Sequence, residues 1–150
     1  SRFPVVAAAA VGVLALAGGA VWVMVGGGGS ARSGARAFDG NWEVSVSCPA
    51  EPAWGTSYGM RFSGQIKDGE MNAQHLERGQ PGSLTLTGQI QADGTALLQG
   101  NGFTGDPKFT AARLAPGTPY TYRATAKLDG KQGTGRRIDG RPCNLYFVKQ

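Results

Sequence analysis

From residue 38 onward, apolar and polar side chains alternate in short stretches separated by glycine-rich turns. In WEVSVSC, residues 42–48, every second residue is apolar, so one face of a strand would carry all of these side chains. A period of two is typical of strands with one buried face. The pattern predicts strands at residues 42–48, 57–67, 70–75, 83–91, 95–100, 109–114, 119–128, 132–138 and 142–148, of which the third is the least regular.

Asp-Gly pairs separate several of these stretches. The segments IKDGEM, IQADGTA and KLDGKQ each place Asp-Gly between alternating runs, which is the strongest short-range signal for a β-hairpin. Short antiparallel strands with one apolar face predict an all-β domain. We expect a small antiparallel eight-stranded β-barrel, with a β-sandwich as the alternative. Closing a barrel would also remove exposed edge strands.

The N-terminal part of the chain has another pattern. Residues 3–25 form a run of 23 residues without a charge. A helix needs about 20 apolar residues to cross a membrane. We therefore predict one transmembrane helix within residues 1–25, which would make the membrane a partner of this chain. The alternatives are a cleaved signal peptide, for which ARA at 35–37 has the form of a cleavage site, and a buried helix.

Residues 26–37 are rich in Gly and Ser and are expected to be a flexible linker to a domain over residues 38–150. All 10 acidic residues and all but three of the 15 basic residues lie in this domain, so it carries little net charge. It has no Lys/Arg cluster interleaved with aromatic residues, which argues against nucleic acid as a partner. Arg136, Arg137 and Arg141 are expected to form a solvated hairpin end.

The two cysteines fall at matching positions of the predicted barrel. Cys48 ends the first predicted strand and Cys143 lies in the last one. First and last strands of an up-and-down barrel are antiparallel neighbours, so the two residues would meet at the seam. We predict a disulfide between them, with two unpaired buried thiols as the alternative. A disulfide indicates an oxidising compartment. Together with the predicted span, it predicts a single-pass inner-membrane protein with its C-terminal domain in the periplasm.

The start of the first strand carries a short motif. Gly40, Asn41 and Trp42 form a Gly-x-Trp that resembles the signature of the calycin superfamily, the lipocalins and avidins. The resemblance covers three residues. It implies that Trp42 plugs one end of the barrel and that a basic side chain near the last strand packs on it, for which Arg141 is the candidate. The alternative is that Trp42 is an ordinary core residue.

A second resemblance concerns the whole layout. The order of the predicted segments is similar to that of small extracytoplasmic β-domains of bacterial membrane proteins. The ending PGTPYTYR…GTGRR…GRPC resembles the C-terminal part of larger chains such as class III nucleotide cyclases. This second resemblance implies no site residues.

The residue types that carry catalysis are scattered along the chain. His75 is the single histidine, the GxSxG pattern of serine hydrolases is absent, and GNGFTG at 100–105 lacks the residues of a phosphate loop, so we expect a loop or bulge there. A metal site would need several clustered ligands. We therefore expect no metal, no cofactor and no enzymatic activity in this chain; any activity would lie upstream of residue 1.

Aromatic residues gather in two predicted connections. Trp54 and Tyr58 lie in the segment 51–59, and Phe103 and Phe109 lie in the long connection 101–119. Aromatic loops at a barrel mouth are places where ligands bind. We hypothesise a membrane-anchored periplasmic binding or sensor module for a small molecule, lipid, glycan or protein partner.

Three alternatives stay open at this point. The same rings would also serve simply to close the end of the core. The chain would then suit a non-catalytic accessory or scaffold subunit of a membrane complex. It would equally suit the C-terminal extracytoplasmic tail of a longer cytoplasmic enzyme, for example a nucleotide cyclase.

Overall fold

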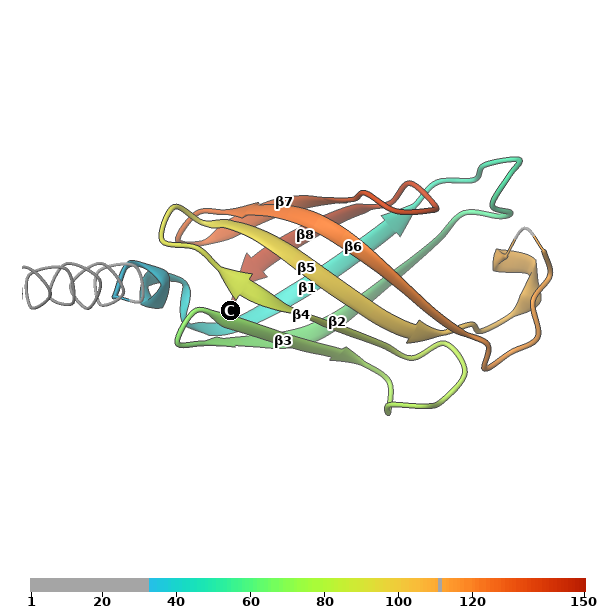
Figure 1. Ribbon diagram of the computed structural model, residues 1–150, viewed down its shortest axis with the longest axis horizontal. Coiled ribbons are helices and arrows are strands. Elements are labelled where there is room, and N and C mark those ends of the chain that lie inside the picture. Colours follow the sequence, from blue (N-terminus) through green and yellow to red (C-terminus); the bar gives the residue numbers. More distant parts are fainter. Residues whose placement is uncertain (1–32, 111) are drawn as a thin grey trace, which may run out of the picture.

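In a computed structural model, which describes residues 33–110 and 112–150, the chain forms a closed barrel of eight antiparallel strands (Figure 1). Each strand pairs with its neighbours in sequence, and β1 pairs with β8 to close the barrel. The strands are β1 (Gly40–Cys48), β2 (Tyr58–Lys67), β3 (Glu70–His75), β4 (Leu84–Ile90), β5 (Thr95–Phe103), β6 (Pro119–Leu128), β7 (Gln132–Arg137) and β8 (Asn144–Lys149). The predicted eight-stranded barrel is confirmed, and the sandwich is excluded.

The predicted transmembrane helix at 3–25 lies outside the described residues. Within 33–110 and 112–150, no helix is both long enough and apolar enough to cross a membrane.

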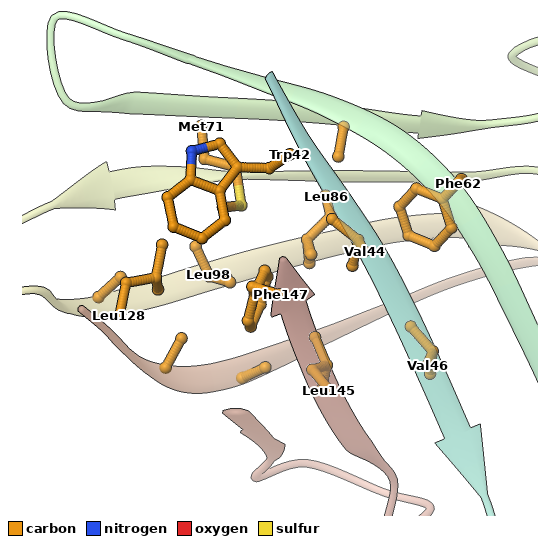
Figure 2. Packing of buried hydrophobic residues seen from close by; sticks show 14 of the residues in the cluster. Trp42, Val44, Val46, Phe62, Met71, Leu86, Leu98, Leu128, Leu145 and Phe147 are labelled. Atoms are coloured by element: carbon orange, nitrogen blue, oxygen red, sulfur yellow. The ribbon is translucent and has the colours of Figure 1, made fainter. Parts of the chain in front are cut away.

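Alternation along the strands fills the barrel with apolar side chains. At the seam, Val44 of β1 stands opposite Phe147 of β8, and both side chains are fully buried. On the other side of β1, Val44 stands opposite Phe62 of β2. Figure 2 shows these side chains pointing toward one another from several strands, with Phe147 among them. Burying each such side chain stabilises the fold by about 1.5–3 kcal/mol, so the inward face holds the barrel together.

The two ends of the barrel differ (Figure 1). At one end, which we call the closed end, short turns join the strands. The turn Asp68-Gly69 has positive φ at both residues, 52° and 78°, the geometry that favours Asp-Gly in two-residue hairpins. The carboxylate of Asp39 accepts hydrogen bonds from both turn amides, at 2.9 and 3.0 Å. The other end, the mouth, carries the long loops 49–57, 76–83, 104–118 and 138–143.

Trp42 occupies the closed end. Its side chain is 1% exposed, and its Nε1 donates a hydrogen bond to the carbonyl oxygen of Phe38 at 2.8 Å. The basic group nearest its ring is Lys149, at the end of β8, whose Nζ lies 5.9 Å from the ring centre. Arg141 lies in a mouth loop and lines a pocket there, so the expectation that Arg141 packs on Trp42 is wrong.

The described end of the predicted linker packs on the barrel. Residues 33–38 are helical, and their last three residues form the 3-10 helix η1 (Arg36–Phe38). The side chain of Ala35 is 2% exposed, and Arg36 forms an ion pair with Asp68 at 3.0 Å. A small apolar side chain and a salt bridge fasten these residues to the closed end. Residues 33–37, which we expected to be flexible, are therefore structured in this fold.

The strand predicted at 109–114 is not formed. In its place the chain makes the short 3-10 helix η2 (Pro107–Phe109) within the loop 104–118. The carboxylate of Asp106 caps this helix by accepting from the amide of Lys108 at 2.9 Å, and Pro107 fixes the backbone angle of its first turn. Local side-chain capping therefore outweighs a weak alternation.

β5 is longer than predicted and runs through Phe103, so the first four residues of GNGFTG are strand rather than loop. Gly100 and Gly102 lie beneath tyrosine rings of β6. A Cβ on Gly100 would come within 2.5 Å of the Tyr122 ring, and one on Gly102 within 2.6 Å of Tyr120. These glycines continue the strand because the facing tyrosines fill the space that they leave.

The predicted disulfide is present. Cys48, the last residue of β1, is bonded to Cys143, the residue before β8, across 95 positions of sequence. Both side chains are buried. The bond therefore fastens the seam at the mouth of the barrel.

Candidate functional site

The mouth loops and the strand ends below them enclose a pocket of about 410 Å³. Small-molecule sites usually have roughly 300–1,000 Å³, so the mouth pocket has the size of a ligand site. All four aromatic residues predicted for a binding site line it, namely Trp54, Tyr58, Phe103 and Phe109. They come from three separate parts of the chain, and the barrel brings them together.

A second concavity, of about 580 Å³, lies on the outer face of β6, β7 and β8. It is the larger of the two, but it is more open, and polar side chains such as Thr125, Lys127 and Arg136 line it. A ligand there would remain mostly in contact with water. We therefore take the mouth pocket as the candidate site.

One wall of the mouth pocket is aromatic and apolar. The rings of Tyr58 and Phe109 lie 5.5 Å apart with a tilt of 55°. Met60 and Leu114 also line the pocket, and Trp54, which is 37% exposed, stands at its rim. Tilted ring pairs at this distance are favourable, so η2 is held against the start of β2 and the wall keeps its shape.

Two tyrosines of β6 lie near the mouth. The rings of Tyr120 and Tyr122 are stacked at 6.3 Å, with an angle of 11° between their planes. Burial raises the pKa of Tyr120 to about 12, assisted by the nearby Tyr58 and opposed by the charge of Arg137. Burial likewise raises the pKa of Tyr122. Both hydroxyl groups are therefore neutral at physiological pH and can donate a hydrogen bond.

Arg141 fixes the loops around the pocket. Its side chain is 3% exposed, and its guanidinium lies 4.9 Å from the ring centre of Tyr58. Its two Nη atoms donate hydrogen bonds of 2.7–3.0 Å to four backbone carbonyl oxygens, those of Pro49, Trp54, Thr56 and Phe109. One arginine thus joins the loops 49–57 and 104–118. The expected solvated hairpin end is wrong for this residue, because these carbonyls replace water around its charge.

Arg137 forms another part of the pocket wall. Its guanidinium lies 4.2 Å from the ring centre of Tyr122, and its Nε donates to the backbone carbonyl of Asp139 at 2.7 Å. Arg137 is therefore half-buried in the mouth, whereas Arg136 next to it is exposed as expected. The alternation along β7 turns one of these two arginines inward.

His75 is the last residue of β3 and also lines the pocket. Its ring lies 5.6 Å from that of Phe62, and within the described ranges its imidazole has no hydrogen-bond partner. In the same ranges no three His, Cys, Asp or Glu side chains are grouped to hold a metal ion. The groups that the pocket does present are aromatic rings, neutral hydroxyls and arginines, which suit binding.

Sequence reasoning missed Tyr120, Arg137 and Arg141 as pocket residues. For Arg137 a signal existed, because in QGTGRR it alternates with Gly133 and Gly135 and so shares the inward face of the strand. For Arg141 there was none, since its partners are backbone carbonyls, which every residue type supplies.

No protein-family model matches the chain, and neither a curated protein nor a solved structure matches it. The likeness to calycins therefore rests on the Gly-x-Trp motif, and the likeness to cyclase tails on the C-terminal segments alone. What the fold itself supports is a closed eight-stranded antiparallel barrel with a disulfide.

Proposed function

We propose that this protein is a binding module that holds a small molecule in its mouth pocket. The observation that carries this proposal is the convergence of Trp54, Tyr58, Phe103 and Phe109 on one hollow of about 410 Å³. Below this hollow the barrel is filled with buried apolar side chains. A ligand would therefore enter between the loops and stop above the core. A purely structural barrel has no need of such a hollow, which favours binding over the scaffold role.

The proposed setting is the periplasmic side of a bacterial inner membrane. Two observations support it: the uncharged run at 3–25, and the disulfide, since such bonds persist mainly in oxidising compartments. In this arrangement the described part of the chain begins at the closed end, and the mouth lies at the opposite end of the strands (Figure 1). The pocket would then face away from the tether and be reached from solution.

The test is the binding of an uncharged solvatochromic dye, followed by fluorescence. We expect the wild-type protein to bind the dye, and Trp54→Ala and Phe103→Ala to bind it several-fold more weakly. Tyr146→Ala is the matched control, because Tyr146 is an exposed aromatic residue on the outer face of β8. Loss of binding in all three variants, or no binding by the wild type, would contradict the proposal.

A further inference from the structure

The mouth pocket contains a guanidinium, that of Arg137, which forms no ion pair with a carboxylate of the described residues. The only side-chain hydrogen bond that Arg137 makes within residues 33–110 and 112–150 is the one from Nε to the backbone carbonyl oxygen of Asp139. Its Nη1 and Nη2 have no partner there, and neither is shut off from solvent in the way that a buried orphan atom is. Its other neighbour is the face of Tyr122. Because Arg137 lines the pocket, its guanidinium contributes two nitrogen donors to the pocket wall that lack a partner among the described residues.

The acidic groups near Arg137 are already engaged. The carboxylate of Asp139 is bound by both Nε and Nη2 of Arg123, at 2.8 and 3.0 Å. Asp106, which also lines the pocket, pairs with Lys108 at 3.2 Å and caps η2. All 10 acidic residues of the chain lie in the described ranges, and none forms an ion pair with Arg137. The carboxylate of Asp139 acts on Arg137 through space, but its oxygens are hydrogen-bonded to Arg123. No carboxylate of the described residues therefore pairs directly with Arg137.

A second cation stands on the same wall. Arg141 is bonded to backbone carbonyls alone, and its Nε is the single buried side-chain nitrogen or oxygen of the described residues that lacks a partner. Burying a charge without an opposite charge nearby costs free energy. The pocket wall thus carries two arginines whose charge an incoming anion would offset.

The apolar part of the pocket lining adjoins the guanidinium of Arg137. A Cβ placed on Gly140 would lie 3.2 Å from Nη2 of Arg137 and 3.6 Å from the indole of Trp54, so the two groups meet over this glycine. From Trp54 the lining continues to Tyr58 and Phe109. A ligand that touches both regions must have a charged end and an apolar body.

We propose that the mouth pocket binds an amphiphilic carboxylate, with the carboxylate on Nη1 and Nη2 of Arg137 and the apolar body against Trp54, Phe103 and Phe109. Two parallel N–H groups of an arginine match the two oxygens of a carboxylate. This inference rests on the proposed function and adds the chemical class of the ligand. The hydroxyl group of Tyr120, which also lines the pocket, supplies a neutral donor.

The experiment compares three probes with the same tail, decanoate, decanol and decylamine, each kept below the concentration at which it forms micelles or separates from solution. Their binding to the full chain in detergent is followed by displacement of the uncharged dye. We expect decanoate to bind roughly tenfold or more tightly than decanol, as a charge-assisted hydrogen bond predicts. Decylamine should bind more weakly than decanol. In Arg137→Gln the preference for decanoate should disappear while decanol affinity is kept, and Arg136→Gln, on the outward face of the same strand, should behave as wild type.

The outcomes separate the two proposals. Equal affinity for decanoate and decanol in the wild type would overturn the carboxylate inference and leave the apolar binding pocket standing. Absence of binding by the dye and by all three probes would overturn both. If Arg137→Gln does not fold, the wild-type ranking of the three probes decides by itself. Arg137→Lys retains the charge but not the two parallel donors, so its preference for decanoate over decanol should be weaker than that of the wild type but not lost.

Discussion

Nη2 of Arg141 lies 2.7 Å from the carbonyl oxygen of Pro49, the residue that directly follows Cys48 in the disulfide. Two residues after Arg141 comes Cys143, the other half of that bond. The covalent link and the hydrogen bond therefore join the same two segments, the end of β1 and the loop before β8, at one corner of the barrel. The loops of the mouth pocket start from this corner, so their geometry depends on it.

Replacing Arg141 by Lys should loosen the mouth and leave the barrel folded. An ammonium group cannot reach four carbonyl oxygens with the planar geometry of a guanidinium, so buried acceptors lose their partners. We expect the free energy of unfolding to fall by about 2 kcal/mol, and hydrogen exchange to increase in the loops 49–57 and 104–118. Urea unfolding and exchange mass spectrometry measure the two effects. Arg136→Lys, at an exposed position, should change neither the free energy of unfolding nor the exchange. Equal changes in the two variants would show that Arg141 does not hold these loops together.

Removing the disulfide should cost more. In the Cys48→Ala/Cys143→Ala variant the unfolded chain regains the freedom of a loop closed across 95 positions. We expect the free energy of unfolding to fall by about 2–5 kcal/mol. Urea titrations of the oxidised protein and the double variant give the difference. A second measurement is thiol alkylation of the native protein, which should occur only after reduction. Alkylation without reduction would show that Cys48 and Cys143 are not bonded in the native protein.

A side chain at Gly100 should disturb the stacked tyrosines. A Cβ there would meet three atoms of the Tyr122 ring at 2.5–2.8 Å, and Tyr122 is held between this glycine and Arg137. Gly100→Val is expected to lower the free energy of unfolding by about 1–3 kcal/mol, the usual cost of overpacking, and to change the near-UV circular dichroism of tyrosine. Gly130→Ala is the control, because nothing lies within 4 Å of the position of its Cβ. Matching losses in both variants would refute the role given to the Gly100–Tyr122 contact.

Asp139 should make stability depend on acid pH. The hydrogen bonds from Arg123 lower the pKa of this carboxyl below its ordinary 3.8, with burial opposing the shift. A folded-state pKa below the unfolded value adds stability that is complete above 3.8 and is lost as the pH falls from there through the folded-state pKa. Wild type should thus be more stable than Asp139→Asn at neutral pH, and the difference should vanish in strong acid. Urea unfolding across the acid range tests this, and a difference that persists or grows toward low pH would contradict the stated sign.

The regular part of the fold was accessible from sequence because it depends on local rules. Alternation and Asp-Gly turns located all eight strands, and the strand-end positions of Cys48 and Cys143 implied the seam and the disulfide. The error at 109–114 arose where a proline and the capping carboxylate of Asp106 compete with a weak alternating pattern. Side-chain hydrogen bonds to the backbone of a neighbouring residue are not visible in a hydrophobic pattern.

Only part of the pocket could be predicted from the sequence. The aromatic residues of the pocket were predicted because they gather in two connections of the sequence. The position of its arginines depends on which side of a strand each one faces and on what surrounds it. Arg136 and Arg137 are the same residue type, and only the alternation of faces along β7 makes one an exposed cation and the other a residue of the mouth pocket. Arg141 lies in a loop without such alternation, and its burial follows from the three-dimensional meeting of two distant loops.

The strand order also has a consequence for how the domain is built. Every pairing except that of β1 with β8 joins strands that are consecutive in the chain. Such pairings join strands that are close in sequence and can grow one hairpin at a time, whereas the seam must bring together the two ends of the domain. We therefore expect an open, curved sheet with two unpaired edges to precede the barrel, and the Cys48–Cys143 bond to form only when those edges meet. Until that bond forms, hydrogen bonds and packing alone hold the seam, and it can open again. Slow oxidation would thus prolong the time in which unpaired strand edges are exposed to other chains, and the yield on expression would follow the supply of oxidant.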